Sequence, residues 1–311
     1  MSILKLNAPC KDYIWGGNRL RTDFFKVSDK DKIAETWELS CHPDGQSIIS
    51  NGKYKGCTLS EYLNTVGYTE LGSNFNGEEF PILIKFIDAK DNLSVQVHPT
   101  DDYAKLHENS LGKTEMWYVI DCKEGASLVC GFKGNPTKQE IAEAVENHTI
   151  MELLNSVPVK KGDVFFIEAG TVHAIGKDIL IAEIQQNSNV TYRLYDYDRG
   201  REVHVKKSLD VIDTNLGRNT KTYPTVSHNG YSTRQLATCK YFDTTLYTID
   251  TKAELLVDST SFASLIFLDG NATITCGEDT LLVRKGDSIF IGANTGKVTI
   301  IGTCECILSK I

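Results

Sequence analysis

Three side chains that can bind a metal ion stand close together in the first half of the chain. Gln96 and His98 lie in the apolar segment LSVQVHP, and Glu115 lies in GKTEMWYVI. A fourth candidate, His173, lies in GDVFFIEAGTVHAIG. Imidazole nitrogens and carboxylate oxygens together suit zinc and other first-row divalent ions. These residue types predict a metal site, provided that the fold brings the segments together.

The pattern around these residues is typical of β-strands. Alternation along a strand places Ser94, Gln96 and His98 on one face and the two intervening valines on the other. Buried polar groups are costly unless they are paired or bound to a metal, so an interior face with these side chains calls for a partner. For one segment alone, the simpler alternative is an edge strand whose polar face is exposed to solvent.

Short alternating runs recur along the whole chain, separated by Gly, Asn and Asp, which predicts an all-β barrel or jelly roll. Helices are few. Sequences that fit a capping box start at Thr58, Thr137 and Thr149, and the last two predict helices across about 138–155. Further short helices are expected after Pro99 and across 206–213.

An internal repeat shows that the strands do not themselves require the polar residues. KGDVFFIEAGTVHAI from 161 resembles KGDSIFIGANTGKVTI from 285, and YVIDCKEGASLVCG from 118 resembles IFLDGNATITCG from 266. The alignment sets Lys297 opposite His173 and Ala263 opposite Glu115. The second copy therefore keeps the strands without the ligands, which favours a metal over a purely structural role in the first copy.

Composition narrows the class of protein. With 311 residues and 41% apolar side chains, the chain can bury a sizeable core in one or two domains. The net charge of −8 and the lack of a basic block argue against nucleic acid as a partner. The N-terminal stretch has no apolar run long enough for a signal peptide and no apolar segment reaches membrane-spanning length, so neither feature is expected. Nine scattered cysteines are expected to be reduced and structural, so a cytoplasmic protein is predicted.

The segments LSVQVHP, GKTEMWYV and AGTVHAIG are similar to those of the type I mannose-6-phosphate isomerases in their short bacterial form, a cupin family. The resemblance covers nearly the whole chain and includes YIWGG at 13–17 and NSNVTYR at 187–193. It implies a mainly β fold of two cupin-type barrels. The catalytic, metal-binding domain is expected over 1–235, with a helical insertion near 136–157, and a second barrel without metal ligands over 236–311.

The same resemblance implies one zinc ion per chain. Its ligands fall on His98, Glu115 and His173, with Gln96 as a further candidate. Two departures concern the substrate loops rather than the metal set. Glu168 stands where cupin patterns often have Pro, and Asn189 stands where longer members of the family carry Asp.

Catalytic residues are expected beside the metal. The family's active-site arginine falls on Arg193, and Glu183 is the expected general base. Lys113 lies two residues before Glu115, so on a strand both side chains point to the same, inward face. Lys113 is expected to contact phosphate or an enediolate. A surface salt bridge for Arg193 and a solvated turn position for Lys113 are the alternatives.

Further substrate contacts are expected from Ser94, Tyr13 and Trp15. Ser94 shares the face of Gln96, so its hydroxyl is expected to touch phosphate, while the two aromatic residues of YIWGG are expected to wall the sugar pocket. A plain strand serine and ordinary core aromatics are the alternatives. His204 is expected at the surface, and the charged stretch at 196–204 is expected to form a solvated loop; the alternative is a loop that closes over substrate near Arg193.

The function that the resemblance implies is zinc-dependent interconversion of mannose 6-phosphate and fructose 6-phosphate. The partner is a small sugar phosphate, and the oligomeric state stays open. One alternative is another cupin metalloenzyme, such as an iron dioxygenase, because two histidines and a carboxylate also suit iron. The other is a sugar-binding cupin without catalysis.

Overall fold

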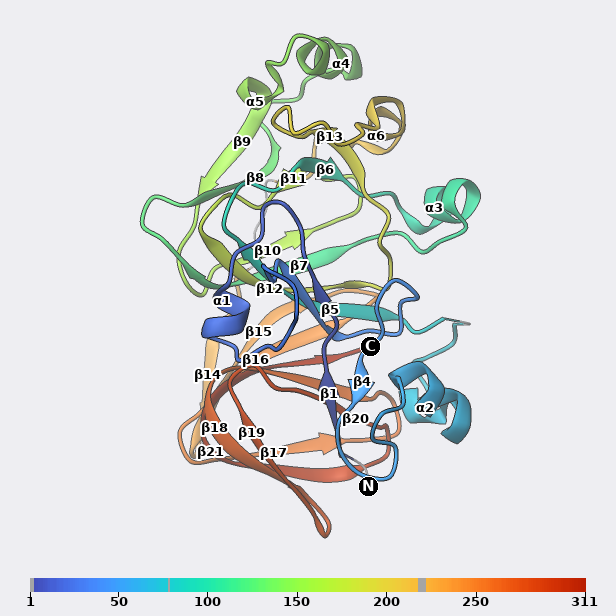
Figure 1. The fold of residues 1–311 in the computed structure, drawn as a ribbon, viewed down its shortest axis with the longest axis vertical. Coiled ribbons are helices and arrows are strands. Elements are labelled where there is room, and N and C mark those ends of the chain that lie inside the picture. The colour runs from blue at the N-terminus through green and yellow to red at the C-terminus, as the bar shows by residue number, and fades with distance from the viewer. Residues whose placement is uncertain (1–2, 78, 218–221) are drawn as a thin grey trace. The chain divides into compact units, whose positions relative to one another are not determined.

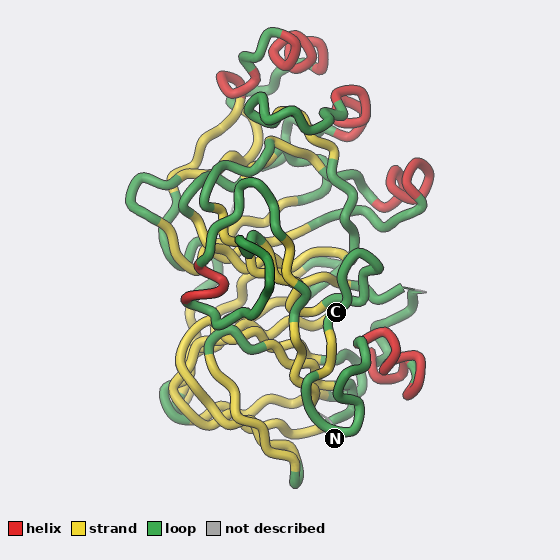
Figure 2. Tube along the Cα trace, viewed as in Figure 1, coloured by secondary structure: helices red, strands yellow, loops and turns green. Residues whose placement is uncertain are grey.

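The computed structural model describes residues 3–77, 79–217 and 222–311, and these fold into two compact units. Unit 1 consists of Met1–Asp12, Asn18–Phe86 and Thr222–Ile311, and unit 2 of Tyr13–Gly17 and Ile87–Lys221. Strands are the commonest regular structure in both units, and helices are few (Figures 1 and 2). The predicted mainly β, jelly-roll architecture is confirmed, although the hydrogen-bonded ladders of the described residues form open sheets rather than closed barrels.

Unit 1 is built on one large antiparallel sheet with the order β14-β15-β16-β21-β18-β20-β1-β4, where β17 also pairs with β21 and β19 with β18. Its strands are β1 (Ile3–Asn7), β4 (Ile48–Ile49), β14 (Thr225–His228), β15 (Tyr231–Thr238), β16 (Asp243–Ile249), β17 (Lys252–Val257), β18 (Ala263–Cys276), β19 (Asp279–Arg284), β20 (Ser288–Ile291) and β21 (Gly296–Lys310). The N-terminal strand joins the C-terminal ones because Ile3 pairs with Ile291.

Apolar side chains that alternate along these strands form the core of unit 1. Along β17, Ala253, Leu255 and Val257 are buried while the residues between them are exposed. The remaining elements of this unit are β2 (Cys10–Lys11), α1 (Arg19–Thr22), β3 (Glu35–Leu39), α2 (Leu59–Val66) and η1 (Tyr68–Leu71). Strand β5 (Ile82–Ala89) begins in unit 1 and ends in unit 2.

The repeated KGD segments fold alike in the two units. Gly162 has φ 89° and Gly286 has φ 87°, a left-handed conformation that glycine adopts without steric cost. Each turn is closed by a carboxylate that accepts a backbone N–H three residues earlier: Asp163 from Lys160 at 2.9 Å and Asp287 from Arg284 at 2.9 Å. The local geometry thus agrees with the repeat inferred from the sequence.

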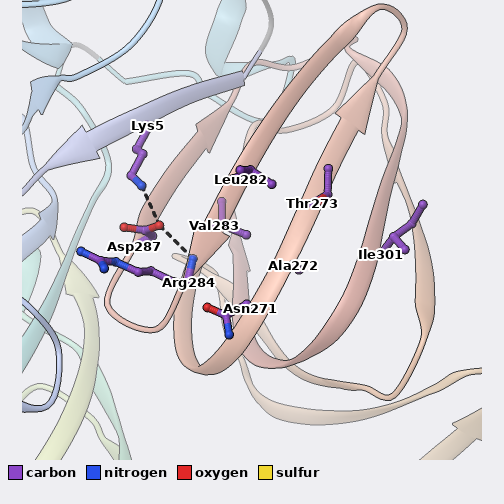
Figure 3. Close-up of a pocket in the computed structure, with 9 residues that line it drawn as sticks. All are labelled: Lys5, Asn271, Ala272, Thr273, Leu282, Val283, Arg284, Asp287 and Ile301. Carbon is purple, nitrogen blue, oxygen red and sulfur yellow. Dashed lines mark hydrogen bonds and ion pairs between the residues drawn. The ribbon is translucent and has the colours of Figure 1, made fainter.

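A hollow of about 430 Å³ opens on the sheet of unit 1 between β1, β18, β19 and β21 (Figure 3). Lys5 Nζ lies 2.6 Å from Asp287 Oδ2 on its wall, and the guanidinium of Arg284 lies 4.6 Å from the centre of the Phe25 ring. The lysine charge is therefore matched by a carboxylate, and Asp287 ties the N-terminal strand to the turn between β19 and β20.

Unit 2 carries two groups of strands. One sheet has the order β13-β6-β11-β8-β9, and β7 pairs with both β10 and β12. These strands are β6 (Val95–Val97), β7 (Glu115–Cys122), β8 (Ser127–Phe132), β9 (Leu154–Pro158), β10 (Val164–Ile167), β11 (His173–Ala174), β12 (Ile179–Gln186) and β13 (Tyr192–Tyr195). Val95 and Val97 belong to its apolar core, so the face of β6 that carries Gln96 is turned away from that core.

The helices of unit 2 are α3 (Asp101–Glu108), α4 (Lys138–Glu146), α5 (Ile150–Leu153) and α6 (Val205–Val211). Capping boxes are confirmed at Thr58 and Thr137, where each threonine side chain accepts the N–H of the glutamate three residues on. The box predicted at Thr149 is wrong: its side chain makes no cap bond, and the chain turns into β9 at Leu154. None of the helices in the described ranges is long and apolar enough to cross a membrane.

Candidate metal centre

Neighbouring strands of unit 2 set three of the predicted residues in one row. Gln96 on β6 is paired with His173 on β11 and with Arg193 on β13. Directly paired residues of adjacent strands point to the same side of a sheet, with Cβ atoms about 4.5–5.5 Å apart. The order β13-β6-β11 therefore brings together segments that lie almost a hundred residues apart in the sequence.

His98, Glu115 and His173 converge, and their ligand atoms all lie within 4.8 Å of one another. His173 Nε2 is 3.1 Å from His98 Nε2 and 3.4 Å from Glu115 Oε1, and His98 Nε2 is 3.6 Å from Glu115 Oε2. All three side chains are buried, with exposures of 0 to 1%. The histidine and carboxylate residues named from the sequence thus form a single cluster.

Hydrogen bonds fix which imidazole nitrogens face the cluster. His98 Nδ1 lies 2.9 Å from the carbonyl oxygen of Val190, and His173 Nδ1 lies 2.8 Å from that of Thr171. Because a carbonyl oxygen only accepts, each Nδ1 carries the proton and each Nε2 presents a lone pair to the cluster. A backbone carbonyl behind the ring is a common way of orienting metal-binding histidines.

The donor set fits a zinc ion. Ligand atoms about 2.0–2.2 Å from a tetrahedral zinc lie about 3.4 Å from one another, close to the separations found here. Burial, and secondarily the charge of Lys113, lowers the pKa of His173 to about 3, so this imidazole is neutral near pH 7. Two neutral imidazoles and one carboxylate are suitable zinc ligands. Gln96 Nε2 lies 3.3 Å from His173 Nε2, so its amide reaches the same place.

Two further charged residues lie in the same interior. Lys113 Nζ donates to Glu115 Oε2 at 2.5 Å and to His98 Nε2 at 3.0 Å, and it lies 4.0 Å from Glu183 Oε1. Lys113 is 4% exposed and Glu183 is 3% exposed. A solvated turn position for Lys113 is therefore wrong, and the side chain of Glu183 points inward.

Trp117 is a neighbour of this cluster that sequence reasoning missed. Its indole Nε1 donates to Glu183 Oε2 at 2.8 Å, and its ring meets the ring of His173 edge-on, with centroids 5.3 Å apart. The available signal was its position two residues after Glu115, on the same face of β7.

Arg193 is held by its own loop. Its Nη1 donates to the carbonyl of Glu202 at 2.7 Å, and its backbone N–H donates to His204 Nδ1 at 3.2 Å. Its Nε is buried and has no hydrogen-bond partner within the described residues. His204, expected at the surface, is partly buried and bonds this strand. Burial, and then the charge of Arg201, lowers the pKa of Arg193.

The stretch at 196–204 is not a plain solvated loop. Asp196 is 4% exposed and pairs with Arg199 Nη2 at 2.9 Å and with Arg201 Nη2 at 2.5 Å. Burial raises the pKa of Asp196, but the two arginines outweigh it and lower the pKa overall. The alternating charges of this stretch did not indicate that Asp196 is buried, because its burial depends on the fold.

The remaining predicted substrate residues have defined positions. Ser94 is 4% exposed and directly precedes β6. The rings of Tyr13 and Trp15 are stacked, with centroids 5.4 Å apart. A Cβ at Gly17 would lie 2.2 Å from Asp88 Oδ2, so a larger residue there would force that carboxylate to shift. Contact of these side chains with a sugar stays a prediction.

Comparisons with known proteins show the family of the chain. The family model "Phosphomannose isomerase type I, catalytic domain" matches residues 3–133, and "Mannose-6-phosphate isomerase, cupin domain" matches residues 232–311. Mannose-6-phosphate isomerase ManA of Bacillus subtilis (strain 168) is 40% identical over 97% of this chain and 96% of its own length. The mannose-6-phosphate isomerase of Streptococcus mutans is 39% identical over 89% of this chain and 88% of its own.

Solved structures show the same fold. The crystal structure of mannose 6-phosphate isomerase from Bacillus subtilis superposes with a TM-score of 0.94 at 34% identity, and covers all of both chains. A mannose 6-phosphate isomerase solved with zinc bound gives a TM-score of 0.81 at 17% identity, over 99% of both chains. By its sequence, its fold and its domain matches, the chain belongs to the type I mannose-6-phosphate isomerases, a family of enzymes with a cupin domain.

Proposed function

We propose that the chain is a zinc-dependent aldose–ketose isomerase that interconverts mannose 6-phosphate and fructose 6-phosphate through an enediol or enediolate. The observation that carries the proposal is the burial of His98, Glu115 and His173 in one cluster with Lys113 and Glu183 beside it. The family supports the substrate, and the donor set supports zinc.

His98, Glu115 and His173 would hold the metal, one ion per chain, with Gln96 as a fourth protein ligand. A zinc ion at this place supplies a Lewis acid for the sugar oxygens. The carbonyls behind the imidazoles keep both Nε2 atoms directed at the site, and the neutral state of His173 supports ligation rather than acid catalysis.

Isomerisation moves a proton between C2 and C1 of the open-chain sugar. Glu183 is the proposed base: its carboxylate accepts the C2 proton, the C–H electrons form the C1–C2 double bond, and the C1 carbonyl π electrons move onto O1. After a proton passes from O2 to O1, the O2 electrons form the C2 carbonyl while the double-bond electrons take the proton back from Glu183 at C1. The ammonium group of Lys113 would stabilise the negative charge that develops on the sugar oxygen. Its position 4.0 Å from Glu183 supports a shared substrate.

Arg193 is the proposed anion holder, because its planar donors suit a phosphate or an enediolate. Its place opposite Gln96 supports this role. Ser94 is proposed as a second phosphate contact, and Tyr13 and Trp15 as the wall of the sugar pocket.

We further propose that residues 1–235 carry the catalytic site and 236–311 the second barrel without metal ligands; the cupin-domain match, which begins at 232, supports that boundary. Nine free cysteines support a cytoplasmic, reducing location.

The test is an isomerase assay on mannose 6-phosphate with the purified metal-loaded protein, run with and without oxygen. We expect fructose 6-phosphate to form at the same rate in both conditions. Dioxygen consumption without isomerisation would favour an iron dioxygenase. Sugar binding without turnover would favour a non-catalytic cupin. Family membership favours the isomerase over both.

A further inference from the structure

We propose that Trp117 is a positioning residue for the isomerisation, which holds the carboxylate of Glu183 in the orientation that proton transfer requires. The inference rests on the proposed function, because it gives Glu183 its role as the base. Trp117 itself is not expected to touch the substrate.

The register of two strands sets this contact. Trp117 on β7 and Glu183 on β12 are directly paired, so their side chains leave the sheet on the same side. The indole N–H reaches Glu183 Oε2 at 2.8 Å, and Trp117 is fully buried. An indole nitrogen only donates, so Glu183 Oε2 is the acceptor of this bond. With one oxygen held by the indole, the direction in which the other oxygen points is also set.

The other oxygen of the carboxylate lies on the side of Lys113. Glu183 Oε1 is 4.0 Å from Lys113 Nζ, whereas Oε2 is bound to the indole. A glutamate side chain has three rotatable bonds, and holding it in one rotamer costs conformational entropy. The bond from the rigid indole reduces that freedom, because the tryptophan has only two rotatable bonds and is packed on all sides.

The indole also touches a metal-binding residue. Its ring meets the His173 imidazole edge-on, with an interplanar angle of 77° and centroids 5.3 Å apart. One rigid side chain therefore sets the positions of the proposed base and of one proposed ligand relative to each other. Near-attack geometry is sensitive to such placement, and a displacement of about 1 Å can cost about a hundredfold in rate.

The first experiment replaces Trp117 by phenylalanine in the metal-loaded protein, which removes the donor and keeps an aromatic ring. We expect kcat on mannose 6-phosphate to fall by roughly tenfold to a hundredfold, with KM within about twofold of the parent value. Bound zinc, measured by atomic emission, should match the parent. A parent-like kcat in a folded, zinc-loaded variant overturns the inference.

Because phenylalanine leaves a void, a second replacement keeps the volume. Benzothienylalanine at position 117 has the two-ring shape of tryptophan with sulphur in place of the N–H, and we expect the same fall in kcat. Tyr62→Phe is the matched control, since its hydroxyl donates to Glu70 Oε2 at 2.9 Å in unit 1. It should lose an aromatic-to-carboxylate hydrogen bond and keep kcat. Normal kcat with benzothienylalanine would show that only volume matters at position 117.

A double-mutant cycle separates this inference from the proposed function. If Trp117 acts through Glu183, Trp117→Phe should cost far less in a Glu183→Gln background than in the parent. An equal loss in both backgrounds would assign the effect to packing against His173 and overturn the inference. If the parent protein shows no isomerase activity, the proposed function fails instead, and that result is visible before any variant is made.

Discussion

The Nε2 atoms of His98 and His173 lie 3.1 Å apart although the two residues are separated by 75 positions in the chain. Each ring donates its Nδ1 proton to a backbone carbonyl, so two lone pairs converge on one point beside the Glu115 carboxylate. Such a group suits a bound metal cation, and Lys113 Nζ lies beside it, 3.0 Å from His98 Nε2. Lys113 therefore lies within reach of any substrate oxygen that approaches the cluster.

The first prediction concerns His173. His173→Ala should abolish both zinc binding and isomerase activity and leave a folded protein, because loss of a ligand disrupts the tetrahedral set. Zinc content and circular dichroism check this. Lys297→Ala changes the corresponding position of the repeat, an exposed lysine 2.7 Å from Glu254, and should leave both properties unchanged. A His173→Ala variant with a full complement of zinc would contradict the assignment.

The second prediction concerns Arg193. Arg193→Lys keeps the charge and loses the planar pair of donors, so turnover should fall at least about tenfold with zinc retained. Steady-state kinetics and zinc analysis measure both. Arg284→Lys, at an arginine of unit 1 that lies over Phe25, serves as the control and should keep the parent rate. Parent-like turnover in Arg193→Lys would shift the anion-holding role to Lys113.

The third prediction concerns Glu183. Glu183→Gln should keep the fold, the zinc and substrate binding, and should slow exchange of the substrate C2 proton with solvent by about 10²–10⁴-fold, since an amide cannot accept that proton. Deuterium exchange at C2 and the thermal midpoint are measured on one sample. Normal exchange together with a lowered midpoint would make Glu183 a structural carboxylate.

The fourth prediction concerns pH. Burial lowers the pKa of His173 from 6.5 in the unfolded chain to about 3 in the metal-free folded protein. Between these values the unfolded state binds the proton and the folded state does not, so stability is present above pH 6.5 and is lost as pH falls toward 3. A shift of this size is worth several kcal/mol.

The measurement is urea unfolding of the chelator-treated protein at pH 7, 5.5 and 4.5. His173→Asn should lose less stability on acidification than the parent, because asparagine does not titrate. Parallel stability curves for the two proteins would show that His173 does not carry this pH dependence.

Local sequence patterns predicted much of the fold because they reflect local physics. Alternation along LSVQVHP correctly separated the face of Val95 and Val97 from the face of Gln96, and the threonine–glutamate spacing at Thr137 produced a helix with both cap bonds. The same spacing failed at Thr149, where the chain had to turn into β9 after a single helical turn. A tertiary requirement overrode the local signal there.

The site was predictable only in part. His98, Glu115 and His173 could be named because ligand types and the family pattern carry the information. The contact of Trp117 with Glu183 depends on the register of β7 against β12, and the burial of Asp196 depends on two arginines that follow it in the loop. The first relationship joins two separate strands, and the second depends on a loop conformation that alternating charges along the segment do not specify.

Zinc titration of the chelator-treated protein tests the central claim most directly. Activity on mannose 6-phosphate should be absent without metal, rise in proportion to added zinc, and stop rising at one zinc per chain. Full isomerase activity in protein that holds no divalent ion, or a zinc-loaded protein that binds the sugar phosphate and does not isomerise it, would contradict the account.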